Sequence, residues 1–330
     1  MRWLIACPVG EGRTKNGVDL GRALAALGEE VAWHDVDARP AAAAMVPKPL
    51  RGAAWKRWIA ARLSEALHGR LRAAPPDVLL VVKGLAIDLA VIAAARQAGI
   101  LTVCMWIDDP VDHERSVARA GAFDIYLTND RAALPDYHAR GHRHVGHFPG
   151  SADPALFHPR PELARDVDVS FVGTRTDRRE QALRALAMPA ARIHGSGWDG
   201  VGPGAGRIGG KLLTGAFNAM INRSRVNLNV HTWFGDGAGM NLRLFEVPAA
   251  GGFLLTDWVA EIDEAYEEDR HLACWRSFDE LRDKARFYLA HEAARERIAA
   301  AGRAHFLARH AYPERARQLL GLVRHRTIAA

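Results

Sequence analysis

The sequence contains little cysteine. Its 330 residues include three, Cys7, Cys104 and Cys274, which lie far apart and form no C-x-x-C pair. An odd and scattered set supports neither a disulfide framework nor a cysteine zinc site. A reducing compartment is the simplest expectation, so we expect a cytoplasmic protein.

Long hydrophobic runs are also missing. The longest apolar stretches, such as residues 100–107, fall far short of the ~20 residues that a membrane-spanning helix needs. The apolar run at 3–9 is followed at once by Glu11 and Arg13, without a small-residue cleavage site. We therefore expect it to be a first buried strand and not a signal peptide.

The sequence has no block of one charge. Residues 1–150 carry 19 basic and 16 acidic residues, and residues 151–330 carry 25 and 22, so the net charge of +6 divides evenly. Without a basic tail, a nucleic-acid partner is not expected. The 49% hydrophobic and 25% charged residues are typical of a globular protein, and the length predicts about two domains at ~150 residues each.

Several common motifs are absent. The first glycine loop, GEGRTK at 10–15, lacks the third glycine of a dinucleotide fingerprint, and no lysine follows the second glycine at Gly12…Gly17 as a phosphate loop requires. Neither H-E-x-x-H nor G-x-S-x-G occurs. Two D-x-D triplets, at 35–37 and 166–168, each sit at a strand end. They fit either a divalent metal on a diphosphate or ordinary turns, and we expect no metal site.

Strand and helix patterns alternate through both halves of the chain. Continuous apolar strands between helices predict parallel sheets buried on both faces. We expect strands at 2–9, 31–36, 77–82, 101–107 and 124–128, then 168–172, 192–195, 226–231 and 253–256. We expect helices at 18–27, 53–73, 88–98, 129–140, 180–187 and 242–250, and an almost wholly helical end from 278.

Residues 149–161 are rich in proline, glycine and serine and are the expected linker. The prediction is an acceptor-side α/β domain at 1–150, a donor-binding α/β domain at 151–310, and a last helix at 311–330 that packs back on the first domain. Two doubly wound domains place a ligand cleft at the carboxyl ends of their strands.

One stretch is more specific than these patterns. Residues 239–257 read GMNLRLFEVPAAGGFLLTD: a helix with a glutamate, a glycine pair, a buried strand, then Thr-Asp. This closely resembles the donor-binding element of GT-B glycosyltransferases, in particular the CgeB-like (spore-maturation type, group 1) family with its N-x-R-x-F-E…GG-x-LLT signature. Further similar pieces lie at 169–173 with Arg179, and at 226–231, 106–110 and 310–315. The resemblance covers most of residues 100–320.

The resemblance implies a GT-B fold and a donor site. Glu246 would bind the ribose of a nucleotide sugar, although it could instead pair with Arg243 three residues earlier. The donor diphosphate would lie at the helix N-terminus after Gly173, among Arg175, Arg178 and Arg179, with Arg243 nearby, unless these arginines simply face solvent. Gly251 and Gly252 are either a helix C-cap or a close backbone approach to the donor.

Retaining members of GT-B enzymes often carry another glutamate eight residues before the ribose-binding one. That position here is Ala238, so contacts with the donor sugar would come from elsewhere, for example Asn241. The resemblance favours a retaining, hexosyltransferase-like enzyme, whereas Ala238 leaves the stereochemistry open. Pro248 removes a backbone hydrogen bond to Leu244 inside the donor helix.

Three residues are catalytic candidates. Asp108 and Asp109 end an apolar strand, and one of them would activate or bind the acceptor hydroxyl, unless the pair with Pro110 is only a turn. His231 ends another strand and would reach the donor sugar, or is simply a strand-end histidine. Lys15 and Arg13 are weaker candidates for phosphate contact.

Residues 51–72 hold six basic residues and one acid, with Trp55, Trp58 and Ile59 among them. The segment is either a helix that contacts anionic lipids or an ordinary amphipathic surface helix. We therefore predict a glycan-biosynthesis enzyme, of bacterial type, that moves a sugar from a nucleotide-diphosphate donor, with a UDP-sugar as first candidate, to a hydroxyl of a glycan, protein or lipid-linked acceptor. No metal or other cofactor is expected. The alternatives are a nucleotide-sugar epimerase and a non-catalytic nucleotide-sugar binder.

Overall fold

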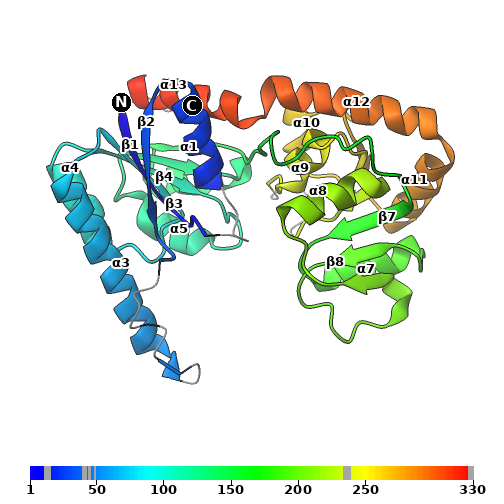
Figure 1. The fold of residues 1–330 in the computed structure, drawn as a ribbon, viewed down its shortest axis with the longest axis horizontal. Helices are drawn as coiled ribbons and strands as arrows, with labels where there is room; N and C mark the ends of the chain where they lie inside the picture. The colour runs from blue at the N-terminus through cyan, green and yellow to red at the C-terminus, as the bar shows by residue number, and fades with distance from the viewer. Residues whose placement is uncertain (11–15, 39–42, 44–45, 48–49, 233–238, 326–330) are drawn as a thin grey trace. The chain divides into compact units, whose positions relative to one another are not determined.

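The structure is a computed structural model, and it describes residues 1–10, 16–38, 43, 46–47, 50–232 and 239–325. The chain folds into two compact units (Figure 1). Unit 1 comprises residues 1–149 and 315–330, and unit 2 comprises residues 150–314.

Unit 1 contains a six-stranded parallel sheet in the order β2-β1-β3-β4-β5-β6. The inner strands β3 and β4 are covered on both faces and are mostly apolar, and β3 is buried at every position. The strands are β1 (Arg2–Cys7), β2 (Glu30–Asp35), β3 (Val78–Val82), β4 (Leu101–Trp106), β5 (Ile125–Thr128) and β6 (Val145–His147). The helices are α1 (Asn16–Ala26), α3 (Ala53–Ala73), α4 (Leu89–Gln97), α5 (His113–Ala120), η2 (Arg131–Ala133), α6 (Leu134–Ala139) and α13 (Tyr312–His325).

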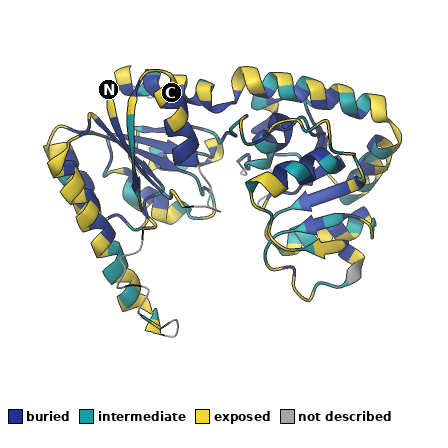
Figure 2. Cartoon of the chain, viewed as in Figure 1, coloured by how far each residue is buried: buried dark blue, intermediate teal, exposed yellow. Residues whose placement is uncertain are grey.

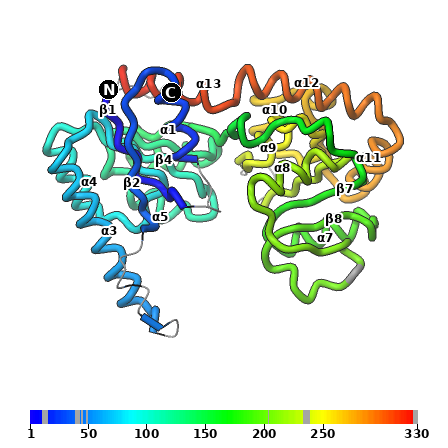
Figure 3. The backbone as a smooth tube through the Cα atoms, viewed as in Figure 1, coloured from blue at the N-terminus to red at the C-terminus, as the bar shows by residue number. Residues whose placement is uncertain are grey.

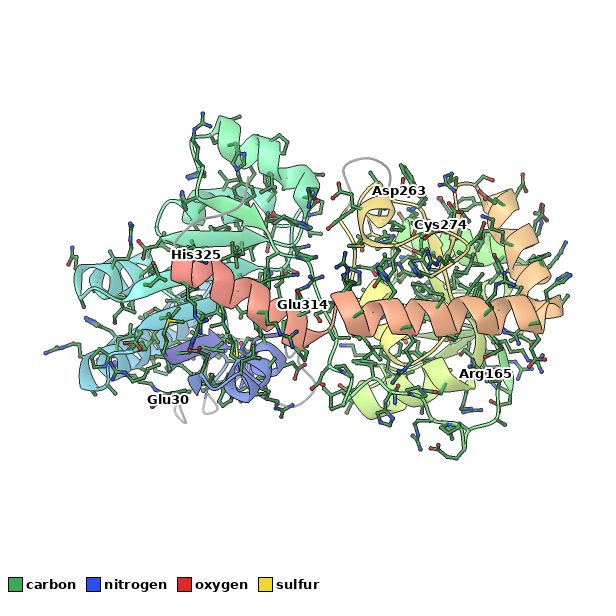
Figure 4. All side chains as sticks on the ribbon, turned by 90° about the horizontal axis from the view of Figure 1, so that it is seen from above. Glu30, Arg165, Asp263, Cys274, Glu314 and His325 are labelled. Carbon is green, nitrogen blue, oxygen red and sulfur yellow. The ribbon has the colours of Figure 1, made fainter. Side chains whose placement is uncertain are left out.

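Helix α13 ends the described chain in unit 1. Figure 4 shows it running from Glu314 to His325 across this unit. Near its end the Arg324 guanidinium donates a hydrogen bond of 3.2 Å to the Glu29 carboxylate, which precedes β2. The side chain of Glu29 is nearly buried, so this contact ties the last helix to the loop between α1 and β2.

Unit 2 contains a second six-stranded parallel sheet, in the order β12-β11-β10-β7-β8-β9. The strands are β7 (Val167–Val172), β8 (Arg192–His194), β9 (Arg207–Gly209), β10 (Ser224–Asn229), β11 (Leu254–Asp257) and β12 (Ala273–Trp275). The helices are α7 (Asp177–Leu186), η3 (Pro203–Ala205), α8 (Thr214–Arg223), α9 (Arg243–Ala249), α10 (Ile262–Ala265), α11 (Phe278–Ala290) and α12 (Glu292–Arg309).

In each unit the hydrophobic core lies between the faces of the sheet and the helices that cover them. Figure 2 shows most strand residues as buried. In unit 2, one layer packs Phe171, Trp198 and Phe253 under α7 and α11, and another packs Phe217, Phe245 and Phe306 under α8, α9 and α12. The predicted α/β architecture of two doubly wound domains is thus confirmed.

Helix α3 is the most exposed long helix of unit 1. Its buried residues, Leu63, Ser64, Leu67 and Leu71, all lie in its second half. Figure 3 shows the first half extending beyond the rest of the unit. The apolar side of the second half therefore packs on the sheet, as an amphipathic surface helix would, while residues 53–60 lie outside it.

Candidate functional site

The sheet of unit 2 has a point where its winding reverses. Strands β7 and β10 are neighbours, but the chain leaves β7 toward β8 on one side and leaves β10 toward β11 on the other. In open α/β sheets, ligands bind beyond the carboxyl ends of the strands at such a point. Here those ends are Val172 and Asn229, followed by α7 and α9 (Figure 1).

Two arginines cross this point in opposite directions. Arg179, in the first turn of α7 after β7, donates from Nε to the carbonyl oxygen of Val230 beyond β10, at 2.8 Å. Arg243, the first residue of α9 after β10, donates from Nε to the carbonyl oxygen of Val172 at the end of β7, at 3.0 Å. Each helix start is thereby fastened to the neighbouring strand, and both guanidinium groups lie at the carboxyl edge.

The charge of Arg243 affects the pKa of Arg179. Burial, together with the nearby charge of Arg243, lowers the pKa of Arg179 to about 10. Arg179 donates a second hydrogen bond to the carbonyl oxygen of Thr174 at 2.9 Å, so among the described residues its guanidinium donates to carbonyl groups and not to carboxylates. Together with the N-terminus of α7, this cation makes the edge a favourable place for an anion.

Glu246 lies one turn into α9. Its Oε2 accepts a hydrogen bond from Arg243 Nη1, three residues earlier, and its side chain is mostly buried. The Glu246–Arg243 pair weighed in the sequence analysis is therefore present. Among the described residues Oε1 accepts no hydrogen bond, which leaves one carboxylate oxygen for a ligand hydroxyl.

Hydrogen bonds from β10 and β11 hold the segment that precedes α9. The Asn241 amide donates to Asn229 Oδ1 at 3.0 Å, and the Asn229 amide donates to Thr256 Oγ1 at 3.0 Å. Asn241 Oδ1 also accepts from the backbone N–H of Arg243 at 3.1 Å. Both ends of the Asn241 amide thus bind protein groups that orient Arg243 and Glu246.

Pro248 leaves one backbone acceptor of α9 without its usual partner. Proline has no N–H to offer the carbonyl four residues earlier, which belongs to Leu244. The Tyr266 hydroxyl donates to that oxygen instead, at 2.7 Å. The helix that carries Glu246 therefore depends on a side chain from the segment after β11.

Three polar residues meet at the ends of β10 and β11. His231 Nδ1 lies 2.7 Å from Asp257 Oδ1, and the His231 backbone N–H donates to the same carboxylate. Arg178 Nη2 donates to Asp257 Oδ2 at 3.2 Å. Burial raises the pKa of the Asp257 carboxyl, but the contacts with His231 and Arg178 outweigh it, so the pKa lies below its ordinary value.

The glycines and Arg175 contact protein groups. A Cβ on Gly173 would lie 2.9 Å from the Phe171 ring, so this glycine makes room for the aromatic side chain. Gly251 has φ +71 after α9, and a Cβ on Gly252 would lie 2.6 Å from Ile221. Arg175 donates to Glu180 at 2.7 Å and to Asp177 at 3.2 Å. The structure thus brings Arg179, Arg243 and Glu246 together, and it pairs Arg175, which precedes α7, with two acidic residues of that helix.

In unit 1, Asp108 and Asp109 have different surroundings. Asp108 is partly exposed and pairs with Lys83, which follows β3 and also lies 3.3 Å from Asp112. Although burial lowers the pKa of Lys83, the two carboxylates outweigh this effect, so its pKa is raised. Lys83 has φ +58, a backbone conformation that non-glycine residues rarely adopt. These groups gather at the carboxyl ends of β3 and β4.

Asp109 is instead fully buried. Its Oδ2 accepts from Thr128 Oγ1 at 2.6 Å and from the Tyr137 hydroxyl at 2.8 Å, and its Oδ1 lies 3.0 Å from His113 Nδ1. His113 Nε2 lies 2.8 Å from Asp136. Burial lowers the pKa of His113, but the two carboxylates outweigh burial and raise it. Asp109 thus holds the turn after β4 to α5 and α6.

The D-x-D triplet at 166–168 also has internal partners. Asp166 accepts from Arg223 at 2.6 and 2.8 Å, and Asp168 accepts from Arg225 at 2.8 Å. Arg13, Lys15 and Ala238 lie outside the described residues.

Sequence reasoning missed the roles of Asp257 and Lys83. Each follows or ends an apolar strand, which is the pattern that drew attention to Asp108. Asp257 closes the family-like stretch, and Lys83-Gly84 follows the strand at 77–82. A rule that tests every polar residue at a strand end would have found both.

Comparison with known structures decides the fold. Sucrose-phosphate synthase from Thermosynechococcus elongatus superposes with a TM-score of 0.71 at 14% identity, covering 98% of this chain and 99% of that one. A glycosyltransferase from Rickettsia africae gives 0.67 at 8% identity, with 98% of each chain covered. The fold is GT-B. The Anabaena protein HepE in complex with UDP-glucose is also similar, with a TM-score of 0.66, 10% identity, and 98% and 100% coverage.

A comparison with protein-family models gives a match in the second half of the chain. Residues 175–321 match the model of a family described as glycosyl transferase-like. This segment includes both crossing arginines, Glu246 and the His231–Asp257 pair. No curated protein matches the chain. The narrower CgeB-like assignment remains a prediction.

Proposed function

We propose that this GT-B protein is a glycosyltransferase that moves a sugar from a nucleotide-diphosphate donor, with a UDP-sugar as first candidate, to a hydroxyl acceptor. One observation carries the proposal: Arg179 and Arg243 cross the switch point of unit 2 in opposite directions, directly beside Glu246. A nucleoside diphosphate needs cations for its phosphates and an acceptor for its ribose hydroxyls, and these residues supply both.

The donor chemistry follows from these groups. Glu246 Oε1 would accept from the vicinal ribose hydroxyls. Arg179, Arg243 and the N-terminus of α7 would stabilise the diphosphate as it gains charge on leaving. The similar HepE structure is a complex with UDP-glucose, which supports a UDP-sugar as the first donor to test.

The acceptor role goes to unit 1. During transfer the acceptor oxygen forms a bond to the anomeric carbon, the bond from that carbon to the phosphate oxygen breaks, and the hydroxyl proton must be taken up. Asp108 is partly exposed and is the better placed of the two aspartates to take or orient that proton. Asp109 would support it through the buried contacts with His113, Thr128 and Tyr137.

Thermal shift and turnover with a panel of nucleotide sugars test the proposal. A ligand at 100 times its Kd stabilises a protein by about 2.7 kcal/mol, which such an assay detects. Glu246→Gln should weaken nucleotide binding by about 2 kcal/mol. Glu267→Gln is the matched control, because Glu267 also pairs with an arginine three residues away in the same unit. Equal nucleotide affinity of the Glu246 variant and the wild type would contradict the ribose role.

The products of the same assay separate the alternatives. Release of nucleoside diphosphate with glycosylation or slow hydrolysis supports a transferase, interconversion of the sugar without acceptor supports an epimerase, and binding without turnover supports a binding protein. The anomeric configuration of the product determines whether transfer proceeds with retention. We propose a CgeB-like, cytoplasmic enzyme of glycan biosynthesis.

We propose that transfer needs no metal, because arginines and helix dipoles replace one at the diphosphate. Activity should therefore survive a chelator. Loss of turnover in EDTA that magnesium or manganese restores would contradict this assignment.

We also propose a weak contact of α3 with anionic membranes. The first half of the helix lies beyond the sheet and carries Trp55, Trp58, Lys56 and Arg57, while no helix among the described residues is long and apolar enough to cross a membrane. The double variant Lys56→Glu/Arg57→Glu should lose co-sedimentation with vesicles that contain anionic lipid. Arg297→Glu, on the exposed side of α12, is the control. Equal sedimentation of both variants would contradict the contact.

A further inference from the structure

His231 is a buried histidine with one ring nitrogen in use. The residue is 2% exposed, and its Nδ1 contacts Asp257. Its other nitrogen, Nε2, is buried without a hydrogen-bond partner among the described residues. Buried polar atoms almost always have a partner, so an orphaned nitrogen at the carboxyl edge of a sheet indicates a ligand.

Asp257 determines which nitrogen carries the proton. Three N–H groups converge on its carboxylate: the backbone N–H of His231, the ring Nδ1 and Arg178 Nη2. An ionised carboxylate only accepts hydrogen bonds, so Nδ1 must carry its hydrogen. In the neutral ring Nε2 then has a lone pair and accepts hydrogen bonds.

The chemistry of the surroundings defines the ligand group. Arg179 is fastened to the carbonyl of Val230, the residue before His231, and Arg178 binds the carboxylate behind the ring. The Arg179 cation suits phosphate oxygens, whereas a neutral acceptor nitrogen suits a hydroxyl. A nucleotide sugar offers both kinds of group a few bonds apart.

We propose that Asp257, braced by Arg178, is a positioning residue that orients His231 so that Nε2 accepts a hydrogen bond from a hydroxyl of the transferred sugar. This inference rests on the proposed function, and it adds a determinant of sugar recognition to the nucleotide site. Asp257 acts only through His231 and does not itself touch the donor.

Asp257→Asn tests the inference because an amide can donate to Nδ1. The proton then moves to Nε2, which becomes a donor where an acceptor is needed. We expect the affinity for UDP to change less than twofold, while kcat/KM for UDP-glucose falls about 10–100-fold. Asp168→Asn is the control for loss of an aspartate paired with an arginine near the same sheet.

A double-mutant cycle distinguishes positioning from simple structural support. If Asp257 acts through the imidazole, Asp257→Asn should add almost nothing to the loss caused by His231→Ala. Additive losses in the double variant would overturn the inference. So would an equal loss of UDP and UDP-glucose affinity in Asp257→Asn.

Arg178→Gln provides a second route if the Asp257 variant does not fold. It leaves the carboxylate and the histidine in place, and we expect a smaller loss of UDP-glucose turnover with unchanged UDP affinity. Unchanged turnover in this variant would overturn the bracing role. If the wild type bound neither UDP nor UDP-glucose, the UDP-sugar proposal itself would fail, a result distinct from those above.

Discussion

The two units have the same layers but different strand orders and different charges at the carboxyl edge. Unit 1 begins with the flavodoxin-like order 2-1-3-4-5, whereas the strands of unit 2, numbered within the unit, follow the Rossmann order 3-2-1-4-5-6 read from one edge. At the edge of unit 1, Lys83 is surrounded by carboxylates. At the edge of unit 2, the hydrogen bonds that Arg179 donates within the described part of the chain go to carbonyl groups and not to carboxylates. The same architecture thus carries a lysine paired with carboxylates at the edge of unit 1. At the edge of unit 2 it carries a surplus cation, Arg179, whose hydrogen bonds leave its charge unneutralised.

The largest expected effect concerns the acidic cluster of unit 1. Asp108→Asn should reduce transfer by about 10²-fold or more, because general acid–base catalysis typically contributes 10²–10⁴-fold. Donor affinity should stay unchanged, since the donor groups belong to unit 2. Steady-state kinetics with varied acceptor measure this effect. A smaller loss that high acceptor concentration rescues would indicate that Asp108 binds the acceptor without taking its proton.

The next effect concerns the surplus cation of unit 2. Arg179→Gln removes one charged hydrogen-bond donor, which corresponds to about 1.5–3 kcal/mol, or roughly 10–100-fold in donor Kd. Calorimetric titration of UDP measures it. If UDP bound the variant and the wild type equally well, the contrast between the two edges would have no role in donor binding.

A third prediction concerns the pH dependence of stability that His113 in unit 1 contributes. The raised pKa of His113 means that the folded state favours the protonated ring. Its stabilising contribution is complete below the unfolded pKa of about 6.5 and is lost as pH rises through the higher folded pKa. The difference in unfolding free energy between wild type and His113→Gln should therefore shrink from pH 6 to pH 9. A difference that stays constant over this range would show that the ring is not protonated in the folded protein.

The smallest effect is expected at Arg175. Its guanidinium already pairs with Asp177 and Glu180 in the first turn of α7. Arg175→Gln should change donor Kd less than twofold under the titration used for Arg179. A loss as large as that of Arg179→Gln would mean that Arg175 leaves its acidic partners to bind the diphosphate.

Local patterns in the sequence predicted much of the fold. The helix expected at 53–73 is α3, and the strands expected at 2–9 and 31–36 are β1 and β2 with ends shifted by one or two residues. Hydrophobic periodicity and glycine or proline at element ends depend on neighbouring residues only, so they can be recognised without knowledge of the tertiary structure. Strand β9 was missed because it lies in a glycine-rich stretch, and β12 because three residues carry too little periodicity. The helix expected at 129–140 starts later, because Asp130 caps η2 and α6 follows from Leu134.

The site was harder to predict because its geometry depends on distant contacts. The family-like stretch pointed to Arg243 and Glu246, and their spacing on a helix made the pair foreseeable. Arg179 and Arg243 each donate to a carbonyl group at the end of the neighbouring strand. This arrangement depends on the order of the strands in the sheet, which no short motif encodes. Asp108 and Asp109 are adjacent in sequence, but one is partly exposed and the other is enclosed by α5 and α6. Their different surroundings follow from packing alone.

The hydroxyl of Tyr266 has a consequence for how the donor helix can vary. It occupies the carbonyl of Leu244 that Pro248 cannot serve, so the two side chains form one functional module across 18 positions of the chain. Tyr266→Phe alone would leave a buried carbonyl unsatisfied in the turn that holds Glu246. The same change combined with Pro248→Ala would return the backbone amide and repair the defect. The orientation of α9 is therefore a property shared with the loop after β11, and neither segment can be exchanged between related proteins without the other.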